Sequence, residues 1–249
     1  MGQLVEKVSG QSCPICRTDS ITTTRPEDRE YTRCSCCGVI RTRFHYNARL
    51  YGKAYAKTYL GYAAGPANTP LNLFRLGLVS RWLLEGEKIL DIGCCVGEFL
   101  RFAEHYYQCT GFEPNTEAAR SARHRCSSPV VSTLDGGVPK VECITLFDVL
   151  EHLEDPKEFL TMLKVEYLYP KGIIVITTPD VSVIEPWDDK RLRKWKHYKP
   201  QEHLWLYTEQ ALAFLANLVG EVVHVGREES DIRPGNPDGD LLTCVIQAS

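Results

Sequence analysis

The chain has 249 residues with a formal net charge of −3 at pH 7, and 43% of its residues are hydrophobic. Such a chain can bury a substantial core, and its slightly acidic balance argues against broad, nonspecific binding to nucleic acid. No run of 18 apolar residues is present, so no membrane span is expected. The amino terminus lacks the apolar stretch of a signal peptide, and we therefore expect a cytoplasmic protein with reduced cysteines.

Two cysteine pairs near the amino terminus carry the spacing of a metal site. The motifs Cys13-Pro-Ile-Cys16 and Cys34-Ser-Cys-Cys37 are separated by 17 residues, which is typical of a tetrahedral zinc site. Because thiolates fill all four positions, the Zn²⁺ would be structural rather than catalytic. We therefore predict a zinc ribbon over residues 1–45. The alternative is that these cysteines are free thiols in a loop-rich arm.

Residues 46–71 form a tyrosine-rich bridge between the ribbon and the rest of the chain. Tyr51, Tyr55 and Tyr59 recur at a spacing of four, which places them near one face of a helix. We expect this segment to be a helical lid over a binding site. A helix that only packs on the core is an equally good interpretation.

Residues 87–102 give the strongest indication of function. A short apolar run around Leu90 ends at Asp91, and small residues follow at Gly93, Cys95 and Gly97 before an amphipathic segment begins. This pattern predicts a strand, a tight turn and a helix. Small residues in the turn let the backbone approach a ligand closely, so the turn indicates a nucleotide-type cofactor.

Three further elements follow in order. A short strand ends at Glu113, at the position where dinucleotide-binding folds place an acid on the ribose hydroxyls. The apolar run 141–147 leads into Asp148, and a helix start follows at Asp155 and Pro156. The run 172–179 is typical of a buried parallel strand. A nicotinamide-dinucleotide interpretation is disfavoured because the turn lacks the G-x-G-x-x-G spacing.

Four segments carry a family resemblance: LDIGCCVGEFL (90–100), GFEPN (111–115), ITLFDVLEHLEDP (144–156) and GIIVITTPD (172–180). Through them the chain resembles the class I S-adenosyl-L-methionine (SAM) methyltransferases, of the UbiG/UbiE-like small-molecule type. The resemblance implies an α/β fold over residues 72–249: a Rossmann-like, seven-stranded, mostly parallel sheet whose last hairpin is antiparallel. It also implies a set of SAM-binding residues. These are Asp91, Gly93, Cys95, Gly97, Glu113, Pro114, Ser132, Thr133, Leu134, Phe147 and Asp148. Cys95 departs from the family, which has a glycine there.

Residues 181–207 form an insertion on the expected substrate side, and we expect it to help wall the acceptor pocket. The stretch 190–199 holds six lysines and arginines and no acid, between tryptophans and tyrosines. Clustered cations beside aromatic rings suit an anionic acceptor. A solvated basic helix is the alternative. Strands over 221–226 and 240–247 would then close the sheet.

Two histidines are the candidate catalytic residues. Methylation of a hydroxyl requires a base, and histidine titrates near neutral pH. His152 follows the strand that carries Phe147, and His203 lies where the insertion returns to the core. Glu151 and Asp148 could assist them. Helix capping or core hydrogen bonding is the alternative role for His152, and a structural role is the alternative for His203.

The sequence therefore favours SAM-dependent methyl transfer to oxygen or activated carbon of a small molecule, such as an anionic compound, a saccharide or a natural product. One alternative is a nucleic-acid methyltransferase, because arginines of the ribbon and the 190–199 run could contact phosphates. Another alternative is a non-catalytic adaptor that binds a partner through its zinc ribbon. The acceptor and the oligomeric state are not indicated by the sequence.

Overall fold

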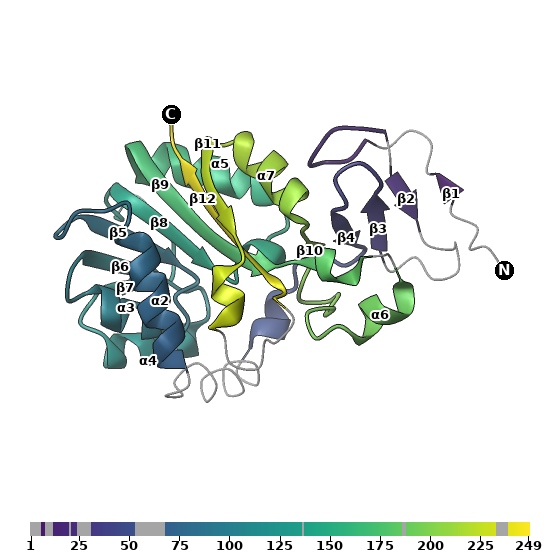
Figure 1. Ribbon diagram of the computed structural model, residues 1–249. Helices are drawn as coiled ribbons and strands as arrows, with labels where there is room; N and C mark the ends of the chain where they lie inside the picture. The colour runs from purple at the N-terminus through teal and green to yellow at the C-terminus, as the bar shows by residue number, and fades with distance from the viewer. Residues whose placement is uncertain are drawn as a thin grey trace.

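The computed structural model describes residues 6–7, 12–19, 21–23, 31–52, 68–135, 137–185, 188–232 and 239–249. Within these residues the strands form a large sheet with helices on both faces and a smaller sheet beside it (Figure 1). No helix in this described part is both long and apolar enough to cross a membrane.

The large sheet has seven strands in the order β11-β12-β9-β8-β5-β6-β7. Its strands are β5 (Lys88–Ile92), β6 (Gln108–Phe112), β7 (Val130–Val131), β8 (Val141–Phe147), β9 (Leu168–Pro179), β11 (Glu221–Gly226) and β12 (Leu241–Gln247). Strands β5 to β9 pair in parallel, whereas β12 is antiparallel to both β9 and β11. This arrangement confirms the predicted Rossmann-like fold with its antiparallel hairpin.

Helices cover both faces of the large sheet and divide its core in two. They are α2 (Thr69–Val79), α3 (Glu98–Ala103), α4 (Thr116–Arg125), α5 (Pro156–Tyr167) and α7 (Glu209–Asn217). Leucines of α5 and α7 pack with Leu90 and Ile92 on one face, and apolar residues of α2, α3 and α4 pack with Ile89 on the other (Figure 1). The alternation along β5 follows from the two-residue period of a strand.

Local capping explains where several of these helices begin. The Asn115 side chain accepts hydrogen bonds at the start of α4, Asp155 accepts from Glu158 N at the start of α5, and Thr208 accepts from Ala211 N at the start of α7. Side chains of these types satisfy N–H groups that have no partner within the helix. The helix start predicted at Asp155 and Pro156 is therefore confirmed.

The small sheet joins the amino-terminal segment to the insertion. Its antiparallel order is β1-β2-β3-β4-β10, with β1 (Glu6–Lys7), β2 (Ile21–Thr23), β3 (Tyr31–Cys34), β4 (Ile40–Thr42) and β10 (Trp205–Leu206). Strand β10 comes from the far end of the predicted insertion and pairs with β4. Cys13, Ile15 and Val39 belong to the same buried cluster as the core of the large sheet. The amino-terminal segment is thus continuous with the main core.

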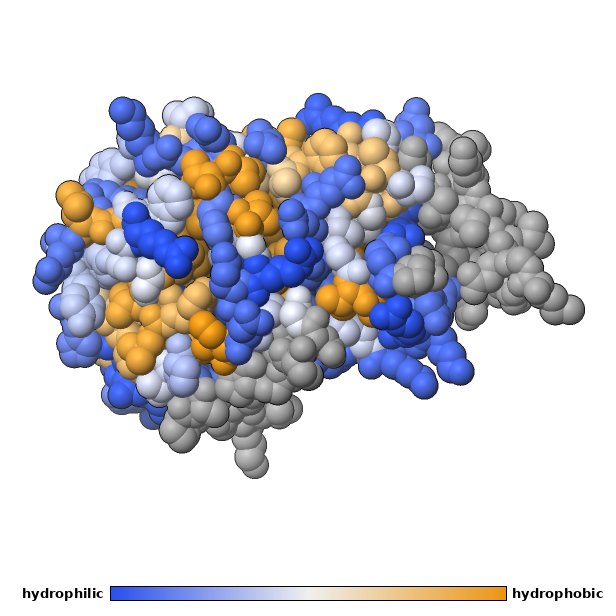
Figure 2. Space-filling view, in the orientation of Figure 1, coloured by the Kyte–Doolittle hydropathy of each residue, from blue (hydrophilic) through white to orange (hydrophobic). Residues whose placement is uncertain are grey.

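The insertion packs against this small sheet. It contains the short helices η5 (Val181–Ile184) and α6 (Asp189–Lys194). Leu192 of α6 is buried against Ile40, and Tyr31 Oη donates to Asp189 Oδ1 at 2.5 Å. Figure 2 shows a hydrophilic surface over α6, which agrees with its four basic residues. Within the bridge, η2 (Ala48–Tyr51) is present, whereas the predicted helical face at Tyr55 and Tyr59 lies outside the described residues.

Candidate functional site

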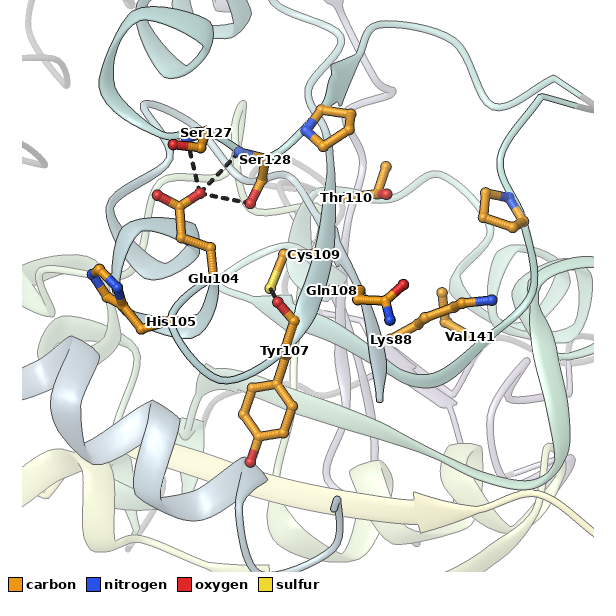
Figure 3. Close-up of a pocket in the computed structure, with 12 residues that line it drawn as sticks. Lys88, Glu104, His105, Tyr107, Gln108, Cys109, Thr110, Ser127, Ser128 and Val141 are labelled. Atoms are coloured by element: carbon orange, nitrogen blue, oxygen red, sulfur yellow. Dashed lines mark hydrogen bonds between the residues drawn. The ribbon is translucent and has the colours of Figure 1, made fainter. Parts of the chain in front are cut away.

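The two ends of the large sheet differ in what they offer a ligand. At the amino ends of β5 and β6, a hollow of about 520 Å³ is lined by Lys88 and Gln108 (Figure 3). Glu104 there accepts three hydrogen bonds of 2.8 Å from Ser127 and Ser128, so its carboxylate is used to hold a turn. Parallel α/β sheets bind ligands at the carboxyl ends of their strands. The candidate site therefore lies at the opposite end.

The turn after β5 adopts backbone conformations that favour residues without a large side chain. Gly93 and Gly97 have φ of +70° and +76°, and Cys95 between them has φ of +50°. A Cβ on Gly93 would lie 2.6 Å from Val149 Cγ2, so a larger residue there would have to displace the Val149 side chain. Left-handed backbone costs an L-residue about 1–2 kcal/mol. Cys95 thus holds a left-handed backbone at some cost in conformational energy.

Glu113 ties this turn to the next one. Its Oε2 accepts from Cys95 N at 3.0 Å and its Oε1 accepts from Asn115 N at 2.8 Å, whereas the neighbouring Pro114 is exposed. Burial raises the pKa of the Glu113 carboxyl, and the two N–H groups oppose that shift. Each carboxylate oxygen has a second lone pair, so a ligand hydroxyl can still donate to it. The residue fits the predicted ribose contact.

Asp91 lies under the same turn, at the end of β5. Its side chain is buried, and Thr145 Oγ1 of β8 donates to Asp91 Oδ1 at 2.7 Å. Burial raises the pKa of Asp91 to about 7. A carboxylate held at this depth is costly to the fold unless a positive group arrives. The amino group at the amino-acid end of SAM is such a group.

Phe147, the last residue of β8, and Asp148, which follows it, both contact Arg75, which the sequence did not single out. The Arg75 guanidinium lies 4.3 Å from the Phe147 ring centroid, and Arg75 Nη2 donates to Asp148 Oδ2 at 3.0 Å. The same Arg75 nitrogen donates to the buried Glu229 at 2.6 Å. Phe147 also meets Phe99 edge-on at 5.0 Å. In the sequence, the available signal was a single arginine within the otherwise largely apolar stretch of α2. The structure shows that this arginine is buried.

Residues 132–134 lie at the carboxyl end of β7, beside β6. Ser132 Oγ accepts from Arg123 Nη2 at 3.2 Å, and Thr133 Oγ1 donates to Asp135 at 3.0 Å. Leu134 packs against the main core. The structure therefore places all the predicted cofactor residues at one end of the sheet, on β5, β6, β7 and β8 and the turns that follow them.

A second group of polar residues gathers beside Asp148. Glu151 and His152 lie in η4 (Leu150–His152), directly after β8, and His203 precedes β10. Their potential ligand atoms lie within 4.8 Å of one another, and Glu151 Oε1 is 4.0 Å from His152 Nε2. The two imidazole rings meet edge-on at 4.8 Å. The structure thus brings the two predicted catalytic histidines together and adds Glu151.

Backbone carbonyls fix both rings in this group. His152 Nδ1 is 2.9 Å from Glu202 O, and His203 Nδ1 is 2.8 Å from His197 O. Because a carbonyl oxygen only accepts, each Nδ1 carries the proton and each Nε2 presents its lone pair. Burial lowers the pKa of His152 to about 4 and that of His203 well below its ordinary value. Both rings are therefore neutral at pH 7.

The small sheet supports the loop that carries His203. Leu204 N donates to Glu151 O at 2.8 Å, and Thr42 of β4 donates through its N–H to Leu204 O at 2.9 Å. The Thr42 hydroxyl also donates to Pro200 O at 3.1 Å. On the other side, Tyr51 Oη lies 2.9 Å from His152 Nδ1. The histidine group is thus held between the small sheet and the bridge.

The four predicted metal-ligating cysteines converge. The Sγ atoms of Cys13 and Cys37 are 3.8 Å apart, those of Cys16 and Cys34 are 3.5 Å apart, and all four lie within 4.8 Å of one another. Four sulfurs around one Zn²⁺ at about 2.3 Å lie about 3.8 Å apart in a tetrahedron. The cluster therefore has the size of a tetrahedral metal site. Cys36 is exposed and is not part of this group.

Comparison with known protein families supports the same interpretation of the large sheet. A family model described as "Methyltransferase domain" matches residues 70–224. The chain belongs to this methyltransferase family. It is a SAM-dependent enzyme with the α/β sheet described above. A comparison with curated proteins finds no significant match.

Solved structures share the fold of this methyltransferase at low identity. The N-methyltransferase NodS from Bradyrhizobium japonicum WM9 is 19% identical with a TM-score of 0.51, over 73% of this chain and 98% of NodS. A TehB-like SAM-dependent methyltransferase from Corynebacterium glutamicum is 17% identical with a TM-score of 0.55, over 82% and 100%. The plantazolicin methyltransferase BpumL, solved with a triazolic desmethylPZN analog and SAH, is 16% identical with a TM-score of 0.54, over 79% and 91%. These similarities concern the fold.

Proposed function

We propose that this methyltransferase transfers the methyl group of SAM to an oxygen, or to an activated carbon, of a small-molecule acceptor. The observation that carries the proposal is the largely buried group of Glu151, His152 and His203. Glu151 and His152 follow β8, and His203 precedes β10. Each neutral imidazole keeps an Nε2 lone pair with which it can engage the acceptor. His152 and His203 are the catalytic pair of this proposal.

The cofactor residues are assigned by their positions at the sheet end. Asp91 and the turn through Gly93, Cys95 and Gly97 would hold the amino-acid end of SAM, and Glu113 would accept from the ribose. Ser132, Thr133 and Leu134 would flank the adenine, while Phe147 and Asp148 would close the other side and Pro114 would border the ribose. Bound SAM supplies an electrophilic sulfonium methyl group. The enzyme's main contribution is then to align the acceptor with that group.

The four-cysteine cluster is assigned a structural Zn²⁺ bound by Cys13, Cys16, Cys34 and Cys37. The sulfur–sulfur distances of 3.5 and 3.8 Å support this assignment. The sequence of residues 1–45 holds few large apolar side chains, so this segment needs a further crosslink to fold. Because β4 supports the loop of His203, the zinc ribbon acts here as a scaffold of the acceptor site.

An acceptor screen with methyl-labelled SAM tests the proposal. Hydroxyl-bearing small molecules, including anionic and saccharide compounds, are offered to the zinc-loaded protein, with RNA and DNA as separate arms. We expect label in a small molecule, and we expect His203→Ala to reduce transfer about a hundredfold or more. His105→Ala is the matched control, because His105 is exposed near the amino-end hollow. Label that enters only nucleic acid, or transfer unchanged in His203→Ala, contradicts the proposal.

A further inference from the structure

The group of Glu151, His152 and His203 combines two imidazole nitrogens with one carboxylate in a buried place. The carboxylate of Glu151 and the ring of His203 are buried, and the ring of His152 is partly buried. Besides burial, the charge of the nearby Lys199 contributes to the lowered pKa of both histidines. This donor set differs from the four-thiolate cluster in both chemistry and position, because it lies at the carboxyl end of β8.

The protons on the two rings are placed as in histidines that bind metals. Each Nδ1–H donates to a backbone carbonyl, from His152 to Glu202 O and from His203 to His197 O. Metal-binding histidines characteristically use one nitrogen in this way, which fixes the ring and directs the other nitrogen at the ion. This leaves the Nε2 atom of each ring as its potential ligand atom.

Glu151 is oriented in a similar manner. Thr178 Oγ1 of β9 donates to Glu151 Oε2 at 3.0 Å, and Glu151 Oε1 lies 4.0 Å from His152 Nε2. Three donor atoms that share one cation at about 2.1 Å lie about 3.4 Å apart in a tetrahedral arrangement. All pairs in the group are within 4.8 Å, so the side chains would rotate inward on binding to reach that separation.

We propose that Glu151, His152 and His203 bind a divalent first-row transition-metal cation that receives the acceptor hydroxyl; this inference rests on the proposed function. Two imidazoles and one carboxylate suit such ions, and three protein ligands leave positions open for an acceptor. His152 and His203 then act as ligands rather than as bases, and the coordinated hydroxyl loses its proton to water more readily. The acceptor oxygen then forms a bond to the methyl carbon, and the carbon–sulfur bond breaks with its electron pair on sulfur. The cation keeps its oxidation state.

Mn²⁺ is the probe, because it prefers nitrogen and oxygen ligands over the thiolates of the zinc-loaded cluster. Electron paramagnetic resonance follows the loss of the free Mn²⁺ signal as the zinc-loaded full chain is titrated, with no SAM or acceptor present. We expect saturation at one Mn²⁺ per chain. Glu151→Gln and His203→Ala should each weaken binding by at least about tenfold, and Thr178→Val should weaken it by about tenfold because it removes the hydroxyl that orients the carboxylate. His105→Ala should bind as the wild type does.

Absence of saturable Mn²⁺ binding to the wild type overturns the proposal, and so does binding that Glu151→Gln and Thr178→Val leave unchanged. If His203→Ala disturbs folding, the test still rests on Mn²⁺ binding by the wild type and on the milder variant Thr178→Val. The two proposals fail separately. Mn²⁺ binding with no methylated acceptor contradicts the proposed function alone, whereas methyl transfer by a protein that binds no Mn²⁺ contradicts the cation site alone.

Discussion

Replacing Asp91 by asparagine is expected to make the fold more stable relative to the wild type as the pH rises, and to weaken SAM binding. In the fold the pKa of Asp91 is raised to about 7 by burial, against an ordinary value of 3.8. The folded chain therefore holds this proton more tightly than the unfolded chain does. As a result, the free energy of unfolding falls as pH rises from the ordinary pKa towards 7, and levels off above it.

The size of this stability change follows from the pH range, below the folded pKa, over which it is measured. One pKa unit corresponds to about 1.36 kcal/mol, so the rise from about pH 5.5 to the folded pKa costs the wild type about 2 kcal/mol. The amide that Asp91→Asn introduces does not titrate, and its oxygen can still accept from Thr145. The free energy of unfolding of Asp91→Asn minus that of the wild type should therefore grow by about 2 kcal/mol between about pH 5.5 and about pH 8.

Urea unfolding of both proteins at the two pH values, with zinc present, measures this difference. Other titrating groups are common to both proteins and cancel when the two are subtracted. A change below about 0.5 kcal/mol would refute the reasoning, because it would mean that Asp91 is ionised in the fold at no cost. Calorimetry on the same samples should show weaker SAM binding by Asp91→Asn, since the carboxylate charge is lost.

Three further changes test other parts of the molecule. Cys34→Ser should release the Zn²⁺, measured by metal analysis, and should lower the free energy of unfolding by several kcal/mol; retention of one Zn²⁺ per chain would contradict the ribbon. Cys95→Val should lower stability by more than about 1 kcal/mol, because a β-branched residue at positive φ is an outlier, whereas Cys95→Gly should tighten or preserve SAM binding in calorimetry. Arg75→Met should lower the free energy of unfolding, followed by thermal unfolding, by about 3–5 kcal/mol because it removes the guanidinium charge beside the buried Glu229. Adding Glu229→Gln should recover part of that loss. An Arg75→Met variant as stable as the wild type would refute this role of the ion pair.

Much of the large sheet could be predicted because its signals are local. The run 141–147 ends at the residue where β8 ends, and Asn115, Asp155 and Thr208 cap the helices that follow them. Each of these signals depends on neighbours within a few residues along the chain. The sheet type, seven-stranded and mostly parallel with an antiparallel last hairpin, then followed from the family resemblance.

Contacts between distant segments could not be predicted in this way. Strand β10 has only two residues, Trp205 and Leu206, and its pairing with β4 joins segments about 165 residues apart, so no periodicity marked it. Likewise, the sequence placed His152 and His203 near the site, but their ring orientations depend on the carbonyls of Glu202 and His197. The position of Glu151 beside them depends on the fold of the turn after β8, and the sequence suggested only that it could assist.

Calorimetric titration of the zinc-loaded protein with SAM tests the central claim most directly. The account predicts one SAM per chain, with binding weakened about tenfold or more in Glu113→Ala through the loss of the hydrogen bonds to the ribose. Glu117→Ala, which changes an exposed acid in the next helix, should bind SAM as the wild type does. No binding by the folded wild type, or equal binding by Glu113→Ala, would contradict it.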